Sequence, residues 1–331
     1  MSDTALRLRE LLSNCDETAF GKPLARELRG RGLIVVAVIL AVLSFGRESV
    51  AAPLDQQARQ EAIDAIPFAQ LSEVAQAKLW GVVSKPSIYR QLPTTVVEAD
   101  PEMYLFLVRY PEVIVNMWQL MGVTKVQLNR TSDYTFDASD GAGTVCNVEL
   151  IYGDQNTHVF YAQGTYEGAL LRKLINGHCV MVLRSNFART EDQHIYVTSR
   201  LDMFVQFDNV GAEILAKTLH PLVGKSADHN FSESTRFLGQ VSQAAATRPA
   251  GVQQLARRLE NIKPRVRGKF VEIAAQSSQR AALCNAGHVV WGSDAAATPV
   301  SIAPVVTPGA AMEGASSLFR SPSRKPLRLR R

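Results

Sequence analysis

The clearest hydrophobic pattern in the chain is an alternation over residues 194–208, HIYVTSRLDMFVQFD. Its apolar positions are Ile195, Val197, Leu201, Met203, Val205 and Phe207, and its polar positions are His194, Tyr196, Thr198, Arg200, Asp202 and Gln206. A period of two is typical of a half-buried antiparallel strand. Because a strand of about 15 residues stays paired only in a sheet that twists and curls, the pattern predicts a curved sheet.

Similar strand patterns come before it, separated by turn residues. We expect strands over residues 124–137, 144–152, 158–167 and 173–187, with turns rich in Asp, Gly and Asn at 137–143 and 153–156. In the first, Val126, Leu128, Tyr134 and Phe136 share a face, and in the second, Cys146, Val148, Leu150 and Tyr152 do so. With residues 194–208, these segments predict an antiparallel meander of five strands.

Segments with helical spacing of their apolar residues precede this meander. Residues 55–82 repeat apolar positions every three or four residues and are divided by Pro67, and a linker follows with one short extended piece at 94–97. Residues 101–122 are the most apolar part of the chain after residue 53, with Asp100 as N-cap and Gly122 as the stop. Pro111 in their middle predicts two short helices or one kinked helix.

Helical spacing returns after the meander, over residues 211–223, 230–246 and 248–262, with breaks expected at Pro221 and Pro249 and a fading pattern after Pro264. The fold class we expect is α+β, a curved antiparallel sheet of about five strands covered by C-terminal helices, with an N-terminal helical segment. We divide the chain into a leader or anchor (1–52), a helical segment and linker (53–100), an α+β domain (101–265) and a mostly disordered basic tail (266–331).

The order of elements over residues 101–250 resembles the helix-grip architecture of the START-related, SRPBCC superfamily. That resemblance implies a curled antiparallel sheet wrapped around a C-terminal helix, with an apolar cavity between them. It concerns element order alone, so it assigns no functional residue. Barrel-like lipocalin relatives fit the run of strands as well.

Residues 32–45, GLIVVAVILAVLSF, form an apolar run with arginines before it and Ser49–Ala52 after it. A run of this length is shorter than the roughly 20 residues of a membrane-spanning helix and is typical of a signal-peptide core. We expect cleavage after Ala51 or Ala52, with an uncleaved membrane anchor and a buried core helix as the alternatives. The first two place the rest of the chain in the periplasm or outside the cell.

Charge argues against nucleic acid as a partner. The net charge of +5 divides into +1 for residues 1–52, zero for 53–292 and +4 for 293–331. The central region therefore has no net basicity to bind a phosphate backbone, and we expect no nucleic-acid partner. If the protein is attracted to an anionic envelope surface, we expect the positive charge of the tail to be responsible.

Few residues suggest catalysis or metal binding. The cysteines have no zinc-type spacing; Cys146 and Cys179 are either bridged or two buried free thiols. Asp133, Asp137 and Asp140 suit a turn better than a calcium-binding loop. His178 and His194 could meet across a strand ladder, but we favour the interpretation that they are ordinary strand histidines. We therefore expect no cofactor and no metal, and leave the catalytic residues unknown.

The polar face of the strand at 194–208 is the candidate ligand site. Tyr196, Thr198, Arg200 and Asp202 would orient a mostly apolar ligand if they lined a concave sheet. The alternative is a solvated outer face with an Arg200–Asp202 ion pair. We expect a non-enzymatic envelope protein that binds a hydrophobic small molecule or lipid; the alternatives are a hydrolase or cyclase-like enzyme on this scaffold and a structural protein with a filled core.

Overall fold

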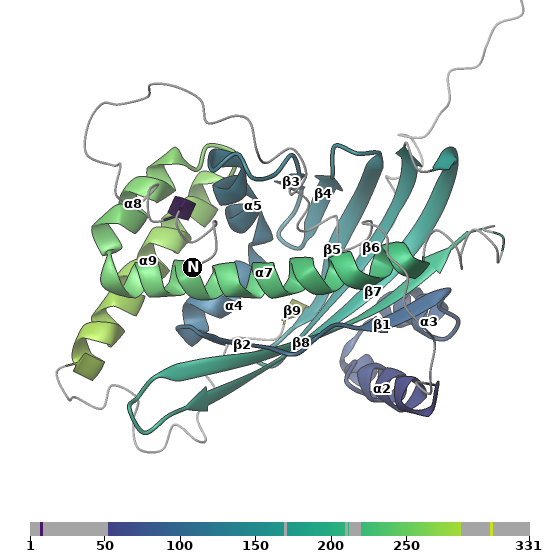
Figure 1. Ribbon diagram of the computed structural model, residues 1–331, viewed down its shortest axis with the longest axis horizontal. Helices are drawn as coiled ribbons and strands as arrows, with labels where there is room; N and C mark the ends of the chain where they lie inside the picture. The colour runs from purple at the N-terminus through teal and green to yellow at the C-terminus, as the bar shows by residue number, and fades with distance from the viewer. Residues whose placement is uncertain are drawn as a thin grey trace, which may run out of the picture.

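The computed structural model describes residues 7–8, 52–168, 171–208, 211, 220–285 and 305–306. Its centre is one antiparallel sheet in the order β1-β8-β7-β6-β5-β4-β3, with β2 paired to β8 and β9 paired to β5 (Figure 1). The strands are β1 (Ile88–Gln91), β2 (Thr95–Glu98), β3 (Gln127–Arg130), β4 (Thr135–Ser139), β5 (Thr144–Gly153), β6 (Thr157–Gly168), β7 (Leu171–Arg189), β8 (Ile195–Phe207) and β9 (Val305–Val306). The helices are α2 (Ala52–Asp64), the 3-10 turn η1 (Phe68–Gln70), α3 (Glu73–Val83), α4 (Pro101–Arg109), α5 (Pro111–Leu120), α7 (His220–Thr247), α8 (Pro249–Arg258) and α9 (Pro264–Asn285). The α+β class, with a curved antiparallel sheet, is confirmed.

The meander has one more strand than the alternation predicted. Residues 124–137 form two strands, β3 and β4, because the chain turns back between them. The backbone N–H groups of Thr131 and Ser132 both donate to the carbonyl of Thr135, at 2.9 and 3.3 Å. The Ser132 hydroxyl also accepts a hydrogen bond from the Tyr134 backbone N–H at 3.3 Å. Such local side-chain to backbone contacts favour a turn over a continued strand.

A bulge in β5 reverses the direction of one predicted side chain. The register of β5 against β6 shifts between Leu150 and Tyr152. The shift puts Ile151 and Tyr152 in the same hydrophobic cluster, whereas Cys146 belongs to the other. The prediction that Tyr152 shares a face with Cys146 is therefore wrong, because an extra residue in a strand inverts the alternation beyond it.

The helices at residues 101–122 follow the expected pattern. Asp100 caps α4 by accepting a hydrogen bond from the Met103 backbone N–H at 3.0 Å, and proline occupies the first turn of both α4 and α5. Gly122 ends the pair with a φ of +67°. Pro111 thus starts a second helix, as the sequence indicated.

The C-terminal helices are longer than predicted. α7 spans 28 residues and crosses the face of the sheet (Figure 1). Pro221 lies in its first turn and does not break it, because a proline there removes no intrahelical hydrogen bond. After Pro249 begins α8, α9 continues from Pro264 to Asn285, past the domain boundary drawn at residue 265.

Two hydrophobic clusters lie on the two faces of the sheet. The larger one joins one face to α4, α5, α7, α8 and α9, and includes Trp118, Leu201 and Phe237. The smaller one packs α2 and α3 against the other face and includes Leu79, Val180 and Phe204. Consecutive residues Met203 and Phe204 are both fully buried, so this part of β8 is covered from both sides.

The apolar segment at residues 32–45 lies outside the described residues, as does nearly all of the tail at 293–331. Among the helices of the described part, none has the length and apolar character needed to cross a bilayer.

Candidate functional site

The main cavity lies between the sheet and α7, and α4 and α5 contribute to its wall. Its volume is about 180 Å³. The sheet supplies Leu128, Phe136, Cys146, Val148, Phe160, Met181, Leu183 and Leu201; the helices supply Tyr104, Leu107, Val108, Pro111, Ile114, Trp118, Phe231, Ser234, Thr235 and Leu238. Every strand from β3 to β8 contributes at least one side chain. The cavity is thus built by the meander and the helices that cover it.

The hydroxyl groups in the lining are already hydrogen-bonded within the protein. Tyr104 Oη lies 2.6 Å from Ser199 Oγ and 3.0 Å from Ser185 Oγ. Ser234 and Thr235 donate to backbone carbonyls one turn earlier in α7, at 2.7 and 3.0 Å. The cavity therefore presents an apolar surface whose polar atoms are largely satisfied.

Two lining residues stand apart chemically. Trp118 is buried and its indole Nε1 has no hydrogen-bond partner in the described part of the chain. Burial, with smaller contributions from Asp140 and Asp137, raises the pKa of the Cys146 thiol to about 12. A thiol held protonated behaves as a small hydrophobic group and not as a nucleophile.

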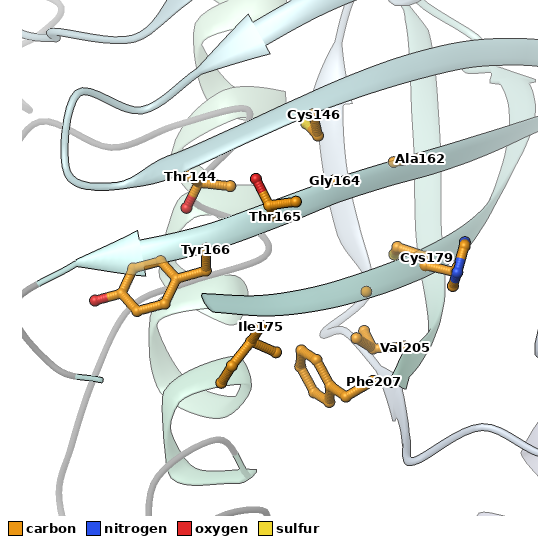
Figure 2. A pocket seen from close by; sticks show the side chains of 12 residues that line it. Thr144, Cys146, Ala162, Gly164, Thr165, Tyr166, Ile175, Cys179, Val205 and Phe207 are labelled. Carbon is orange, nitrogen blue, oxygen red and sulfur yellow. The ribbon is translucent and has the colours of Figure 1, made fainter. Parts of the chain in front are cut away.

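A smaller pocket of about 40 Å³ adjoins the main cavity at Cys146. Figure 2 shows its walls on neighbouring strands, with Cys146 on β5, Gly164 on β6 and Cys179 on β7. Gly164 and Gly177 are cross-strand partners in it. A Cβ on Gly164 would lie 2.4 Å from Cys146 Cβ and 2.5 Å from the Val145 carbonyl oxygen, so only glycine fits there.

The four residues predicted to bind ligand lie on the other face of β8. Tyr196, Thr198, Arg200 and Asp202 line none of these pockets; the residues of β8 that face α7 are the alternating apolar ones, such as Leu201. Their ligand-binding role stays a prediction. The apolar half of the alternation, and not the polar half, reaches the main cavity.

Asp202 is the centre of a buried polar network on that other face. Its side chain is fully buried and accepts hydrogen bonds from Tyr89 Oη at 2.8 Å, Gln91 Nε2 at 3.0 Å and Arg184 Nη2 at 2.6 Å. Arg200 Nε lies 3.7 Å from Asp202 Oδ2, so the two residues form the ion pair that the alternative interpretation of this face predicted. Arg200 Nη2 also lies 3.5 Å from Glu61 Oε2 on α2. These contacts connect α2 to the sheet and tie the side chains of β1, β7 and β8 together.

The histidines are separated in the structure. His178 pairs across the ladder with Gln206, and its ring contacts Tyr161 Oη at 2.8 Å, while His194 contacts Glu98 at the opposite end of β8. His178 and His194 therefore do not meet. His158 is fully buried and accepts a hydrogen bond from Arg109 Nε at 3.0 Å; burial, followed by the Arg109 charge, lowers the pKa of His158 to about 3.

The aspartate-rich turn serves the backbone. Asp140 Oδ1 accepts hydrogen bonds from the N–H groups of Ala142 and Thr144, at 2.7 and 2.9 Å, and Asp137 accepts one from Asn147. Within the described residues there is no cluster of three potential metal ligands. The turn interpretation of this segment accounts for these contacts.

Cys146 and Cys179 are free, buried thiols. They lie on β5 and β7, and β6 runs between those strands. A disulfide needs Cα atoms within about 7 Å, so strands separated by a third strand do not favour one.

The sequence did not single out the helical residues that line the cavity. Tyr104 and Trp118 belong to a run that is apolar throughout, and such a run does not reveal which side chains face a cavity and which fill a core. A signal was present in Ser185 and Ser199, two small polar residues at apolar positions of their strands, which are the partners of Tyr104.

Comparison with known proteins leaves the family open. No protein-family model matches the chain, and no curated protein matches it. Among solved structures, the hypothetical protein jhp0584 from Helicobacter pylori is 12% identical over 46% of this chain and 89% of that chain, with a TM-score of 0.29. Ara h 8.0201 is 6% identical over 46% and 94%, with a TM-score of 0.28, and truncated norcoclaurine synthase from Thalictrum flavum is 13% identical over 45% and 94%, also at 0.28. Likenesses at these TM-scores carry no argument for this chain.

Proposed function

We propose that this protein binds a small, mostly apolar molecule in the main cavity. The observation that carries the proposal is the space of about 180 Å³ between the sheet and α7, whose lining is almost wholly apolar. Ligand pockets of this kind are concave and predominantly hydrophobic, with few polar groups. The curved sheet across a long C-terminal helix also supports membership of the helix-grip superfamily.

The volume favours a compact ligand over a lipid. Cavities of about 150 Å³ lined by aliphatic and aromatic side chains bind benzene, whereas drug-sized ligands occupy roughly 300–1,000 Å³. A cavity of about 180 Å³ therefore fits one substituted ring or a short branched chain. The presence of this cavity also argues against the alternative that the protein has a completely filled core.

The lining supports binding more than catalysis. In the described part of the chain, no Asp, Glu, His, Lys or Arg side chain lines the main cavity. General acid–base chemistry needs such a group within hydrogen-bond reach of the reacting atom. The remaining titratable groups, Tyr104 and Cys146, both have a pKa raised by burial.

We further propose that the protein works in the cell envelope. This rests on the composition of residues 32–45 and their flanks. N-terminal sequencing of the protein from its native source tests it: a start at Pro53 or Ala52 supports cleavage, and a start at Met1 or Ser2 counts against it.

Trp118 fluorescence tests the binding proposal. Trp80 is 55% exposed, so a variant carrying Trp80→Phe and Trp291→Phe leaves Trp118 as the reporter inside the cavity. We expect ethylbenzene to change Trp118 emission saturably, and palmitate to bind at least tenfold more weakly. A flat response to ethylbenzene and to other single-ring probes would contradict the proposal.

A further inference from the structure

A second cavity, in which five of the eight lining residues carry amide side chains, lies beside the main cavity and shares Leu128 with it. It has a volume of about 230 Å³ and lies between α5, β3 and the connection from α8 to α9. Its lining residues are Glu112, Val115, Asn116, Gln119, Gln127, Leu128, Asn129 and Asn261. Amide groups supply donors and acceptors together, which is unusual for a wall that only fills space.

The wall carries no unbalanced charge. Glu112 is buried and is held by Arg130 through two contacts, at 2.5 Å to Oε1 and 3.1 Å to Oε2. A bidentate pair of this kind satisfies both carboxylate oxygens. Within the part of the chain that the structure describes, the cavity therefore offers no free charge to attract an anion or a cation.

The hydrogen bonds within the wall leave one buried acceptor open. Gln119 Nε2 donates to the Val126 carbonyl at 2.7 Å, which fixes Gln119 Oε1 as the acceptor for Asn116 Nδ2 at 3.0 Å and Asn261 Nδ2 at 3.2 Å. Asn116 Oδ1 then has no partner in the described part of the chain, although Asn116 is only 4% exposed. A buried acceptor without a donor is costly, so a rotation of the Asn116 side chain that brings Oδ1 to a ligand O–H or N–H is stabilised.

The absence of aromatic side chains from this lining narrows the ligand further. Nucleobases are normally held by stacking on aromatic rings, and none of the described residues that line this cavity carries a ring. The apolar contributions come from Val115 and Leu128, which suit the C–H face of a saturated ring. We propose that this cavity binds a compact neutral polyol, a monosaccharide unit, either free or at the end of a glycan.

Side-chain amide NMR on the full chain tests the proposal directly. D-glucose and N-acetyl-D-glucosamine are titrated to millimolar concentration, with maltotriose and chitotriose as the glycan-end probes. We expect saturable shifts of the amide signals of Asn116, Gln119 and Asn129 with at least one of the four. Response to the monosaccharides indicates a free sugar, and response to the trisaccharides alone indicates a glycan end.

Matched variants separate the site from general effects. Gln127 and Asn129 are exposed on the edge strand β3, so Q127L/N129L changes the wall without emptying the core, and we expect it to weaken binding at least tenfold. Gln163→Leu, at an exposed strand position outside this cavity, should leave binding unchanged. Thermal unfolding verifies that both variants are folded. Absence of any saturable shift, equal shifts of Asn147 and Gln163, or undiminished binding by Q127L/N129L would each overturn the proposal.

Discussion

The hydroxyl of Tyr104 on α4 lies 2.6 Å from the hydroxyl of Ser199 on β8, and both residues are buried. Ser185 on β7 completes the group at 3.0 Å from the same phenol oxygen. This contact attaches α4, which lines the main cavity, to two of the strands that form its wall. Burial raises the pKa of Tyr104, so the phenol stays neutral and remains a donor.

Tyr104→Phe should lower the free energy of unfolding by about 1–3 kcal/mol, because it leaves two buried serine hydroxyls without their phenol partner. Tyr196→Phe is the matched control, since Tyr196 is 36% exposed and lies on β8, the strand that carries Ser199. Its change in the free energy of unfolding should stay within about 0.5 kcal/mol. Urea unfolding of both variants measures the difference. Equal stability of Tyr104→Phe and the wild type would show that the hydroxyl group does not hold α4 in place.

Gly164→Ala should destabilise the protein by about 1–3 kcal/mol, because the new Cβ would overlap Cys146 and the Val145 backbone. Gly81→Ala is the control: a Cβ at Gly81 in α3 meets nothing within 4 Å, and alanine in a helix should stabilise by up to about 1 kcal/mol. Thermal unfolding should move the two midpoints in opposite directions. A Gly164→Ala protein as stable as the wild type would mean that β5 and β6 are not held this close together.

His158 should make the protein less stable as the pH falls. Its folded-state pKa of about 3 lies below the ordinary value of about 6.5, so the unfolded chain takes up a proton that the folded chain refuses. This contribution to stability is complete above pH ~6.5 and is lost towards pH ~3, at up to about 1.4 kcal/mol per pH unit.

His158→Gln keeps an acceptor for Arg109 and removes the titration, so its stability should depend less steeply on pH between about 6.5 and 3. His229→Gln, at an exposed position of α7, should retain the wild-type dependence. Urea unfolding at pH intervals across this window distinguishes the variants. Parallel curves for wild type and His158→Gln would rule out the buried histidine as the source.

Local signals predicted much of the fold correctly. The alternation at 194–208 is β8, Asp100 caps α4, and Pro111 divides the apolar run at 101–122 into two helices. Each of these features depends on a few neighbouring residues. A period of two, a capping carboxylate or a proline ring acts where it stands in the chain.

The elements that the sequence missed depend on distant contacts. β1 has no alternation of its own and forms because it pairs with β8, while α9 packs against α7 and α8 to bury Phe270. The same limit applies to the site. Alternation shows that β8 has two faces. Which face borders the cavity depends on the packing of α7, a helix from the C-terminal part of the chain, against the sheet.

The central claim is that an apolar molecule occupies the space between the sheet and α7, and a pair of β5 variants tests it most directly. Val148 lines the cavity, whereas Val145 on the same strand is 58% exposed on the other face, so Val148→Phe fills the space and Val145→Phe does not. Calorimetric titration with ethylbenzene should show at least tenfold weaker binding by Val148→Phe, with both variants folded by thermal unfolding and Val145→Phe binding as the wild type does. Equal binding by the two variants would contradict the account.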